Sequence, residues 1–214
     1  GISEPVETSC RVNGGCVIGP FQGISIGSGD LVGLVGWDAN CDELADWGAI
    51  DVTVPLWEDR KIYVSTAYGG RWKLCHCSSV FHATCSTARE FNTAAGALVI
   101  RGPRQSYTEA TCLFRRECDL GLVDVEDPWE EDRVGFLFGV NVTCGTVEPA
   151  ISNPAKNGSL ALQFNHTALQ YGGWWTVCYC FGPDCVTKHD FSVSARMNVR
   201  VIGPSRIDTE LPCE

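Results

Sequence analysis

Cysteine is the residue type best placed to do chemistry in this sequence, because 13 of the 214 residues are cysteines. Thiols at this density hold metals or carry out redox reactions in a reducing compartment, and they form disulfides in an oxidising one. Cys75, His76 and Cys77, with His82 and Cys85 close behind, offer the nitrogen and sulfur ligands of a zinc site. Zinc binding and cross-linking are therefore the two alternatives that the rest of the sequence has to separate.

An internal repeat favours cross-linking. The segment YGGRWKLCHC at 68–77 recurs as YGGWWTVCYC at 171–180. Six cysteines have counterparts 100 to 103 positions later, namely Cys10 and Cys112, Cys16 and Cys118, Cys41 and Cys144, Cys75 and Cys178, Cys77 and Cys180, and Cys85 and Cys185. Tyr179 replaces His76 in the second copy, and only the cysteines persist. No metal site is therefore expected in this region.

The repeat also divides the chain. Gly-Pro followed by a cysteine after eight residues occurs at Pro103 and again at Pro204. This register predicts a first unit at 1–103 and a second at 104–204. Residues 205–214, which carry Cys213, then begin a third unit or form a linker between subunits.

Six cysteines in each unit predict three disulfides per unit, and their spacing alone permits fifteen pairings. Local spacing favours short bridges from Cys77 to Cys85 and from Cys180 to Cys185, with the other four cysteines of each unit stapling the fold across longer loops. If all bridges stay inside units, the partner of Cys213 belongs to the third unit. If the first cysteine of each unit pairs backwards, Cys112 and Cys213 bond to the preceding units.

The elements that must position these cysteines are strands. β-Branched and aromatic runs at 61–67, 71–77, 96–102 and 174–180 are bounded by Gly, Pro, Asn and Asp. Only 41–47 and 85–91 have the composition of a short helical turn. Units of about 100 residues made of short strands predict an all-β fold with two tandem immunoglobulin-like sandwiches. Trp72 and Trp175, each beside a repeated cysteine, are expected to pack in the core against a disulfide.

The pattern YGGxWxLCxC, followed by a cysteine, a phenylalanine and GxLxVxGP, resembles the cysteine-rich immunoglobulin-like repeats of very large extracellular proteins of algae and other protists. These include mastigoneme-type proteins, which build hair-like filaments on flagella. The resemblance implies an extracellular, glycosylated, filament-forming role, and it carries over no catalytic residue.

Three segments of the second unit have the Asn-x-Ser/Thr pattern of N-glycosylation, with no proline in the middle position. They begin at Asn141, Asn157 and Asn165. Because a glycan must face solvent, these segments are expected at the surface.

Acidic residues gather in two loops. The denser cluster consists of Asp124, Glu126, Asp127, Glu130, Glu131 and Asp132, and the looser one of Asp38, Asp42, Glu43 and Asp46. A solvated surface is the favoured interpretation. A calcium ion that stiffens the chain is the alternative, because calcium takes six to eight oxygen ligands.

Other classes of function are disfavoured. The net charge of −10 repels nucleic acid, and no apolar stretch is long enough for a membrane span. A catalytic serine or cysteine needs a histidine base, and none of the histidines recurs between units, so no enzyme activity is expected.

The sequence therefore predicts a structural subunit of an extracellular glycoprotein filament or cell-surface coat. Self-association is expected through strand edges and through the segment 205–214. The alternative is an adhesion or carbohydrate-binding ectodomain, since seven tryptophans offer flat surfaces for sugars.

Overall fold

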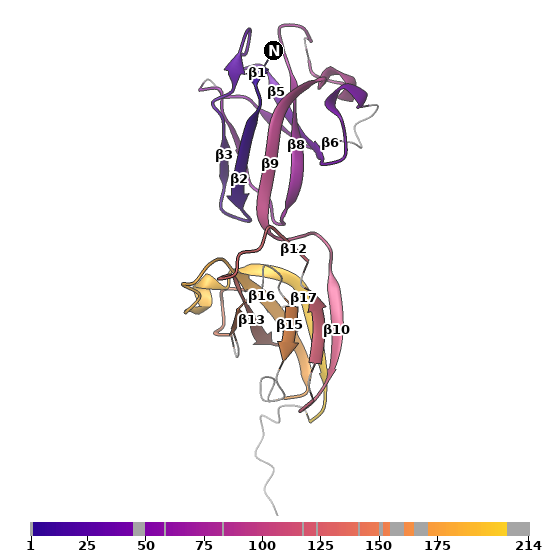
Figure 1. Cartoon of the computed structure of the whole chain (residues 1–214), viewed down its shortest axis with the longest axis vertical. Coiled ribbons are helices and arrows are strands. Elements are labelled where there is room, and N and C mark those ends of the chain that lie inside the picture. Colours follow the sequence, from indigo (N-terminus) through magenta and orange to yellow (C-terminus); the bar gives the residue numbers. More distant parts are fainter. Residues whose placement is uncertain are drawn as a thin grey trace, which may run out of the picture. The chain divides into compact units, whose positions relative to one another are not determined.

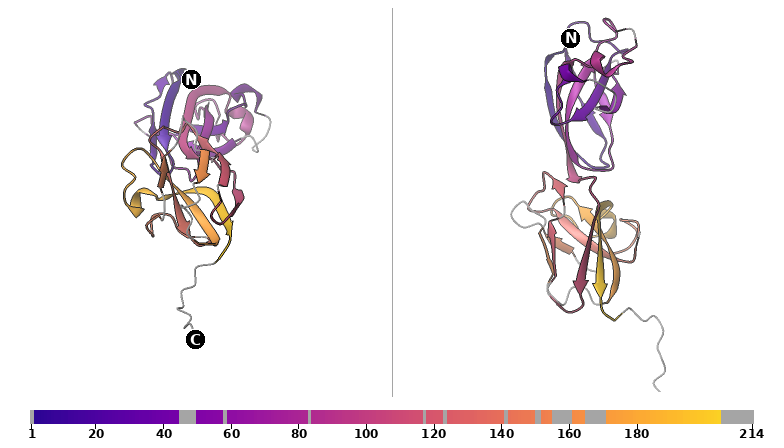
Figure 2. Two further views of the ribbon diagram at one scale, coloured as in Figure 1. Left: turned by 60° about the horizontal axis from the view of Figure 1, so that its bottom comes forward. Right: turned by 90° about the vertical axis from the view of Figure 1, so that its right-hand side faces the viewer.

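A computed structural model describes residues 2–44, 50–57, 59–82, 84–116, 118–122, 124–140, 142–149, 152–154, 161–164 and 171–204. Within these ranges the chain is all β, apart from three single turns of 3-10 helix. It divides into two compact units, Gly1–Arg101 and Gly102–Glu214. Figure 1 shows both units and labels many of their strands, and Figure 2 shows from two further directions that strands form the body of each unit.

Unit 1 consists of two layers of strands. Its elements are β1 (Ile2–Glu4), β2 (Val6–Arg11), β3 (Cys16–Ile18), β4 (Gln22–Gly23), β5 (Leu31–Gly36), β6 (Ile50–Pro55), β7 (Ile62–Val64), β8 (Gly70–Cys77) and β9 (Thr93–Pro103). The main sheet has the order β2-β9-β8-β5-β6, in which β2 is parallel to β9 and the other pairs are antiparallel. The antiparallel pair β3–β7 forms a second sheet, and β1 pairs with β4.

Unit 2 repeats this arrangement. Its elements are β10 (Thr108–Leu113), β11 (Cys118–Leu122), β12 (Val125–Glu126), β13 (Arg133–Phe138), β14 (Ser152–Pro154), β15 (Ala161–Phe164), β16 (Gly173–Cys180) and β17 (Val193–Ile202). The main sheet has the order β10-β17-β16-β13-β14, again with a parallel pair, β10–β17, at one edge, and β11–β15 forms a second sheet. Gly102 and Pro103, the last residues of β9, pair with β12. Both of these residues belong to unit 2, so this pairing lies within unit 2.

Alternation along the strands decides which side chains form the core of each sandwich. In β8, Trp72, Leu74 and His76 are nearly inaccessible, and their neighbours across the sheet include Leu98 and Val32. From the second sheet, Ile18, Ile62 and Val64 are also buried, whereas Val17 and Tyr63 alternate with them and stay exposed. This pattern is that of two sheets packed face to face. The strand order matches the immunoglobulin-like sandwich that the sequence predicts.

The parallel pair of unit 1 requires a glycine. Gly96 lies opposite Val6 at φ +143°, and a Cβ added there would lie 1.9 Å from the carbonyl oxygen of Val6. A larger residue would therefore push β2 off the sheet. The register of the pair β8–β9 shifts close to Gly96, which marks a bulge in β9. The equivalent bulge in β17 of unit 2 contains Arg196 at φ +52°.

The short helical turns expected at 41–47 and 85–91 are single 3-10 turns, η1 (Cys41–Glu43) and η3 (Ala88–Glu90). A third turn, η4 (Lys188–Asp190), occupies the place of η3 in unit 2. Thr87 caps η3 and Thr187 caps η4, each through a capping box. These turns hold the loops that carry Cys85 and Cys185.

Candidate functional site

Two disulfides of unit 1 lie on the outer face of the main sheet, away from the second sheet. Cys41 bonds to Cys75 and Cys77 bonds to Cys85. Cys75 and Cys77 alternate along β8 with the core residues Leu74 and His76, so they point to the opposite face. Their sulfurs pack in a small buried cluster whose other members are Val35, Leu44, Ala88 and Phe91. We call this cluster the outer-face clamp, because it fastens the loops of η1 and η3 onto the sheet.

Unit 2 has the same outer-face clamp. Cys144 bonds to Cys178 and Cys180 bonds to Cys185, and the first bridge spans 34 positions, as the bridge from Cys41 to Cys75 does. The equivalent cluster contains Leu137, Cys178, Cys180, Cys185 and Phe191, with Val142 and Cys144 packed against it. Gly135 makes room for the ring, since a Cβ there would lie 2.8 Å from an atom of Phe191.

The predicted short bridges, Cys77–Cys85 and Cys180–Cys185, are present. The expectation that the other four cysteines of a unit all staple across longer loops is wrong for unit 1, where Cys10 bonds to Cys16 over only 6 positions. Because Cys10 is used within its own unit, backward pairing is also wrong there. β2 and β3 meet at a tight turn, which brings these two thiols together without a long loop.

The other predicted cysteines are described less fully. Cys112 is in a disulfide. The backbone of Cys118 lies in β11, but its side chain is outside the described residues. Cys213 is outside them altogether, as are the three predicted glycosylation sites at Asn141, Asn157 and Asn165. These assignments stay predictions.

The repeated tryptophans lie in the core, as expected, but on the face opposite the bridges that their neighbouring cysteines form. Trp72 and Trp175 are buried, with exposed fractions of 5% and 2%. They lie on the core face of β8 and β16, whereas the neighbouring cysteines lie on the outer face. Trp175 packs edge-on against Phe138 at 5.1 Å between ring centroids.

A buried carboxylate anchors the loops at one end of the unit 1 sandwich. Asp30 is fully buried and accepts hydrogen bonds from the backbone N–H and hydroxyl of Ser79 at 2.8 and 2.9 Å, and from the N–H of Gly27 at 3.3 Å. His76 Nε2 lies 2.8 Å from the same carboxylate and donates to it, since an ionised carboxylate only accepts. Burial by itself raises the pKa of Asp30, but the hydrogen bonds from Ser79, His76 and Gly27 outweigh it and hold that pKa below its usual 3.8.

Unit 2 carries an equivalent carboxylate, Asp132, 102 positions later. It is also fully buried, and it accepts from the N–H groups of Trp129 and Gly182, each at 2.8 Å. The hydroxyl of Tyr179 donates to it in the place of His76. Both copies therefore keep this aspartate, which the sequence analysis did not single out, and the residues that change are its donors.

The residues considered for metals have other roles in the described chain. Cys75, Cys77 and Cys85 are in disulfides, so their sulfurs are not available as thiolate ligands. In the acidic loop, Asp132 turns inward, and Glu126 is bound by the guanidinium of Arg104 at 2.6 Å. No group of three or more His, Cys, Asp or Glu residues that could hold a metal ion occurs within the described ranges.

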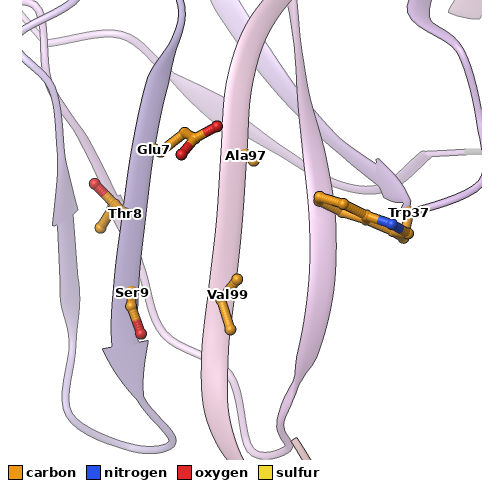
Figure 3. A pocket seen from close by; sticks show the side chains of 6 residues that line it. All are labelled: Glu7, Thr8, Ser9, Trp37, Ala97 and Val99. Carbon is orange, nitrogen blue, oxygen red and sulfur yellow. The ribbon is translucent and has the colours of Figure 1, made fainter. Parts of the chain in front are cut away.

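A shallow groove lies on the outer face of unit 1, beside the clamp. It is lined by Glu7, Thr8, Ser9, Trp37, Ala97 and Val99, and its volume is about 320 Å³. Figure 3 shows Glu7 and Trp37 on opposite sides of Ala97 and Val99. Trp37 is 44% exposed and presents its indole to solvent. Sequence reasoning did not single out Trp37, because it has no aromatic counterpart in the second copy.

No protein-family model matches the sequence, and no curated protein matches it significantly. None of the helices in the part of the chain that the structure describes is long and apolar enough to cross a membrane. The five disulfides of described cysteine pairs fit an extracellular location, where such bonds form and persist.

Solved structures give only distant similarities. The chain is similar to the BSP domain of a biofilm-associated protein (8% identity, TM-score 0.26, covering 96% of this chain and 30% of that one). It is also similar to fibronectin(III)-like modules of CbhA from Clostridium thermocellum (9% identity, TM-score 0.24, covering 99% of this chain and 97% of that one). A third similarity is to the four N-terminal immunoglobulin domains of Dscam1 (10% identity, TM-score 0.28, covering 92% of this chain and 51% of that one). The immunoglobulin-like assignment depends on the strand order of the two units and not on these scores.

Proposed function

We propose that the chain is a tension-bearing stretch of an extracellular glycoprotein filament or surface coat, built from tandem disulfide-clamped β-sandwiches. The observation that carries this proposal is the parallel pairing of β2 with β9 in unit 1 and of β10 with β17 in unit 2. In each unit the parallel partners are an early strand and the last strand of the main sheet.

Parallel pairing of these strands suits a chain that is pulled from its ends. Tension draws the start of β2 and the end of β9 in opposite directions along the strands, so the ladder between them is sheared. The bonds of the six residue pairs from Val6–Gly96 to Arg11–Arg101 then share the load, and they do not open one at a time. The force that a unit withstands is set by its unfolding rate. Under the same force, a ladder that is sheared unfolds more slowly than a ladder whose bonds open one at a time.

The disulfides limit what happens if a unit does open. In unit 1 they close loops of 6, 34 and 8 positions, so about 160 Å of chain cannot extend even after unfolding, at about 3.4 Å per residue. The clamp of unit 2 supports the same reasoning. A covalently limited extension is a useful property in a filament under repeated load.

Single-molecule pulling from the two ends of the oxidised chain tests the mechanical role. Thr8→Pro in β2 should lower the unfolding force of unit 1, because proline cannot donate to the ladder with β9. Thr53→Pro in β6, an edge strand outside the path of the force, is the matched control and should leave that force unchanged. Equal loss in both variants would show that the pair β2–β9 does not carry the load.

Imaging of the native assembly tests the filament role. Antibodies raised against the 214-residue chain should label ordered fibrils at regular intervals in negatively stained, non-reduced extracts. Labelling of isolated, unassembled molecules alone would contradict the proposal and favour a separate adhesion ectodomain.

A further inference from the structure

The groove on the outer face of unit 1 has the chemistry of a small ligand site. Its volume of about 320 Å³ falls at the lower end of the range for small-molecule sites, roughly 300–1,000 Å³. Glu7 and Ser9 stand directly across from Ala97 and Val99 in the parallel pair, so these side chains share one face. Trp37 lies on the other side of Ala97 and Val99 from Glu7, so these two apolar side chains lie between the indole and the carboxylate (Figure 3).

We propose that this groove binds a neutral sugar residue of a glycan. The ring C–H groups of a pyranose form an apolar face that packs on a flat aromatic surface, which Trp37 provides. The carboxylate of Glu7 makes no hydrogen bond or ion pair with any residue of the described chain. It can therefore accept from two neighbouring sugar hydroxyls in charge-assisted hydrogen bonds. The hydroxyl of Ser9 can donate or accept beside it.

The charges around the groove favour a neutral ligand over a charged one. Arg71 and Lys73 pair with Val99 and Ala97 on the neighbouring strand β8, so two cations share a face with the anionic Glu7. A cationic ligand would be repelled by them, and one aromatic side chain does not make the cage that ammonium groups require. An anionic sugar would meet the carboxylate of Glu7 in the lining of the groove itself, whereas neither cation lines it and the Lys73 ammonium donates to the carbonyl oxygen of Ala39 at 2.8 Å. The net charge of −10 adds to this repulsion.

Unit 2 provides an internal comparison, because its sheet has the same register. Asn198 and Arg200 stand where Ala97 and Val99 stand in unit 1, opposite Glu109 and Thr111. The guanidinium of Arg200 lies 5.8 Å from the ring centroid of Trp174, so unit 2 has a long charged side chain where unit 1 has Val99. The inferred sugar site therefore belongs to unit 1, and transferring the unit 2 residues should close it. This inference goes beyond the proposed mechanical role and does not depend on it.

The test is an NMR titration of the full oxidised chain with neutral tetrasaccharides of glucose, mannose, galactose and N-acetylglucosamine. At least one should shift the Trp37 indole N–H signal and the amide signals of Ala97 and Val99, with a Kd on the order of 1 mM. The Trp37 signal is identified by its loss in Trp37→Ala. Tetragalacturonate and tetramethylammonium serve as anionic and cationic probes, and neither should shift these signals.

Variants decide whether the groove is responsible. Trp37→Ala and Val99→Arg should each weaken binding at least tenfold, as read from the amide of Ala97. Trp57→Ala removes another exposed tryptophan of unit 1, 58% exposed, and should leave the Kd within twofold. Well-dispersed spectra confirm that each variant is folded. Ala97→Asn introduces the residue that unit 2 has at this position, Asn198, and is a second variant that should weaken binding. Absence of saturable shifts with all four neutral sugars, equal binding of a charged probe, or unchanged binding by Trp37→Ala would overturn the inference.

Discussion

Removing one buried hydroxyl should destabilise unit 2 strongly. The hydroxyl of Tyr179 donates to the carboxylate of Asp132, and both side chains have no exposed surface. Tyr179→Phe keeps the ring and its edge-on contact with Phe181 but removes this donor from the carboxylate oxygen that also accepts from the N–H of Trp129. Loss of a buried hydrogen bond to a charged group costs roughly 1.5–3 kcal/mol, and we expect about 2 kcal/mol here. For a unit of about 100 residues this corresponds to a fall in Tm of about 8–16 °C.

The matched control is Tyr63→Phe, the same change in unit 1 at a side chain that is 50% exposed and whose hydroxyl makes no hydrogen bond within the described chain. It should alter the free energy of unfolding by no more than about 0.5 kcal/mol. Differential scanning calorimetry of the full oxidised chain measures the difference. Hydrogen exchange assigns it, with faster exchange expected in β16 of unit 2 and unchanged exchange in β8 of unit 1. A change for Tyr179→Phe as small as that for Tyr63→Phe would refute the argument that the buried aspartate anchors its unit.

Three further predictions concern unit 1. Because the pKa of Asp30 is lowered in the folded state, its carboxylate stabilises unit 1 above about pH 4, and this contribution is lost as the pH falls below the usual 3.8. Asp30→Asn should therefore be less stable than wild type at pH 7. In urea titrations between pH 5 and pH 2, its free energy of unfolding should fall by less than that of wild type. Replacing Cys41 and Cys75 together by alanine should lower the free energy of unfolding by about 4 kcal/mol, the value expected for a 34-residue loop, and a change below about 1 kcal/mol in urea unfolding would argue against the clamp. Gly96→Ala should cost about 3 kcal/mol or more by the same measurement, because its backbone is at φ +143° and its Cβ would meet the carbonyl of β2, whereas Gly36→Ala, with nothing within 4 Å, should be close to neutral.

Much of the clamp could be predicted from the sequence because its information is local. Alternation in β16 placed Cys178 and Cys180 on one face, and the short loop to Cys185 favoured the bridge that the structure has. The same alternation places Trp175 on the face opposite that bridge. The tight turn that joins Cys10 to Cys16 depends on how β2 and β3 meet, and spacing alone does not fix it.

The buried aspartates were missed although the signal was present. Asp30 and Asp132 each precede a repeated strand, β5 or β13, at the same spacing. Their importance lies in burial, and an aspartate beside a loop is ordinarily exposed. The groove at Trp37 could not have been found in the sequence, because it forms only when β2, β9 and the residue after β5 meet in space.

Mapping the disulfides of the non-reduced chain by protease digestion and mass spectrometry tests the central claim, that two copies of one module each carry the same outer-face clamp. The expected cross-linked peptides join Cys41 to Cys75 and Cys77 to Cys85 in unit 1. In unit 2 they join Cys144 to Cys178 and Cys180 to Cys185. A peptide that joins the two units through any of these eight cysteines, or free thiols at these positions in the folded protein, would contradict it.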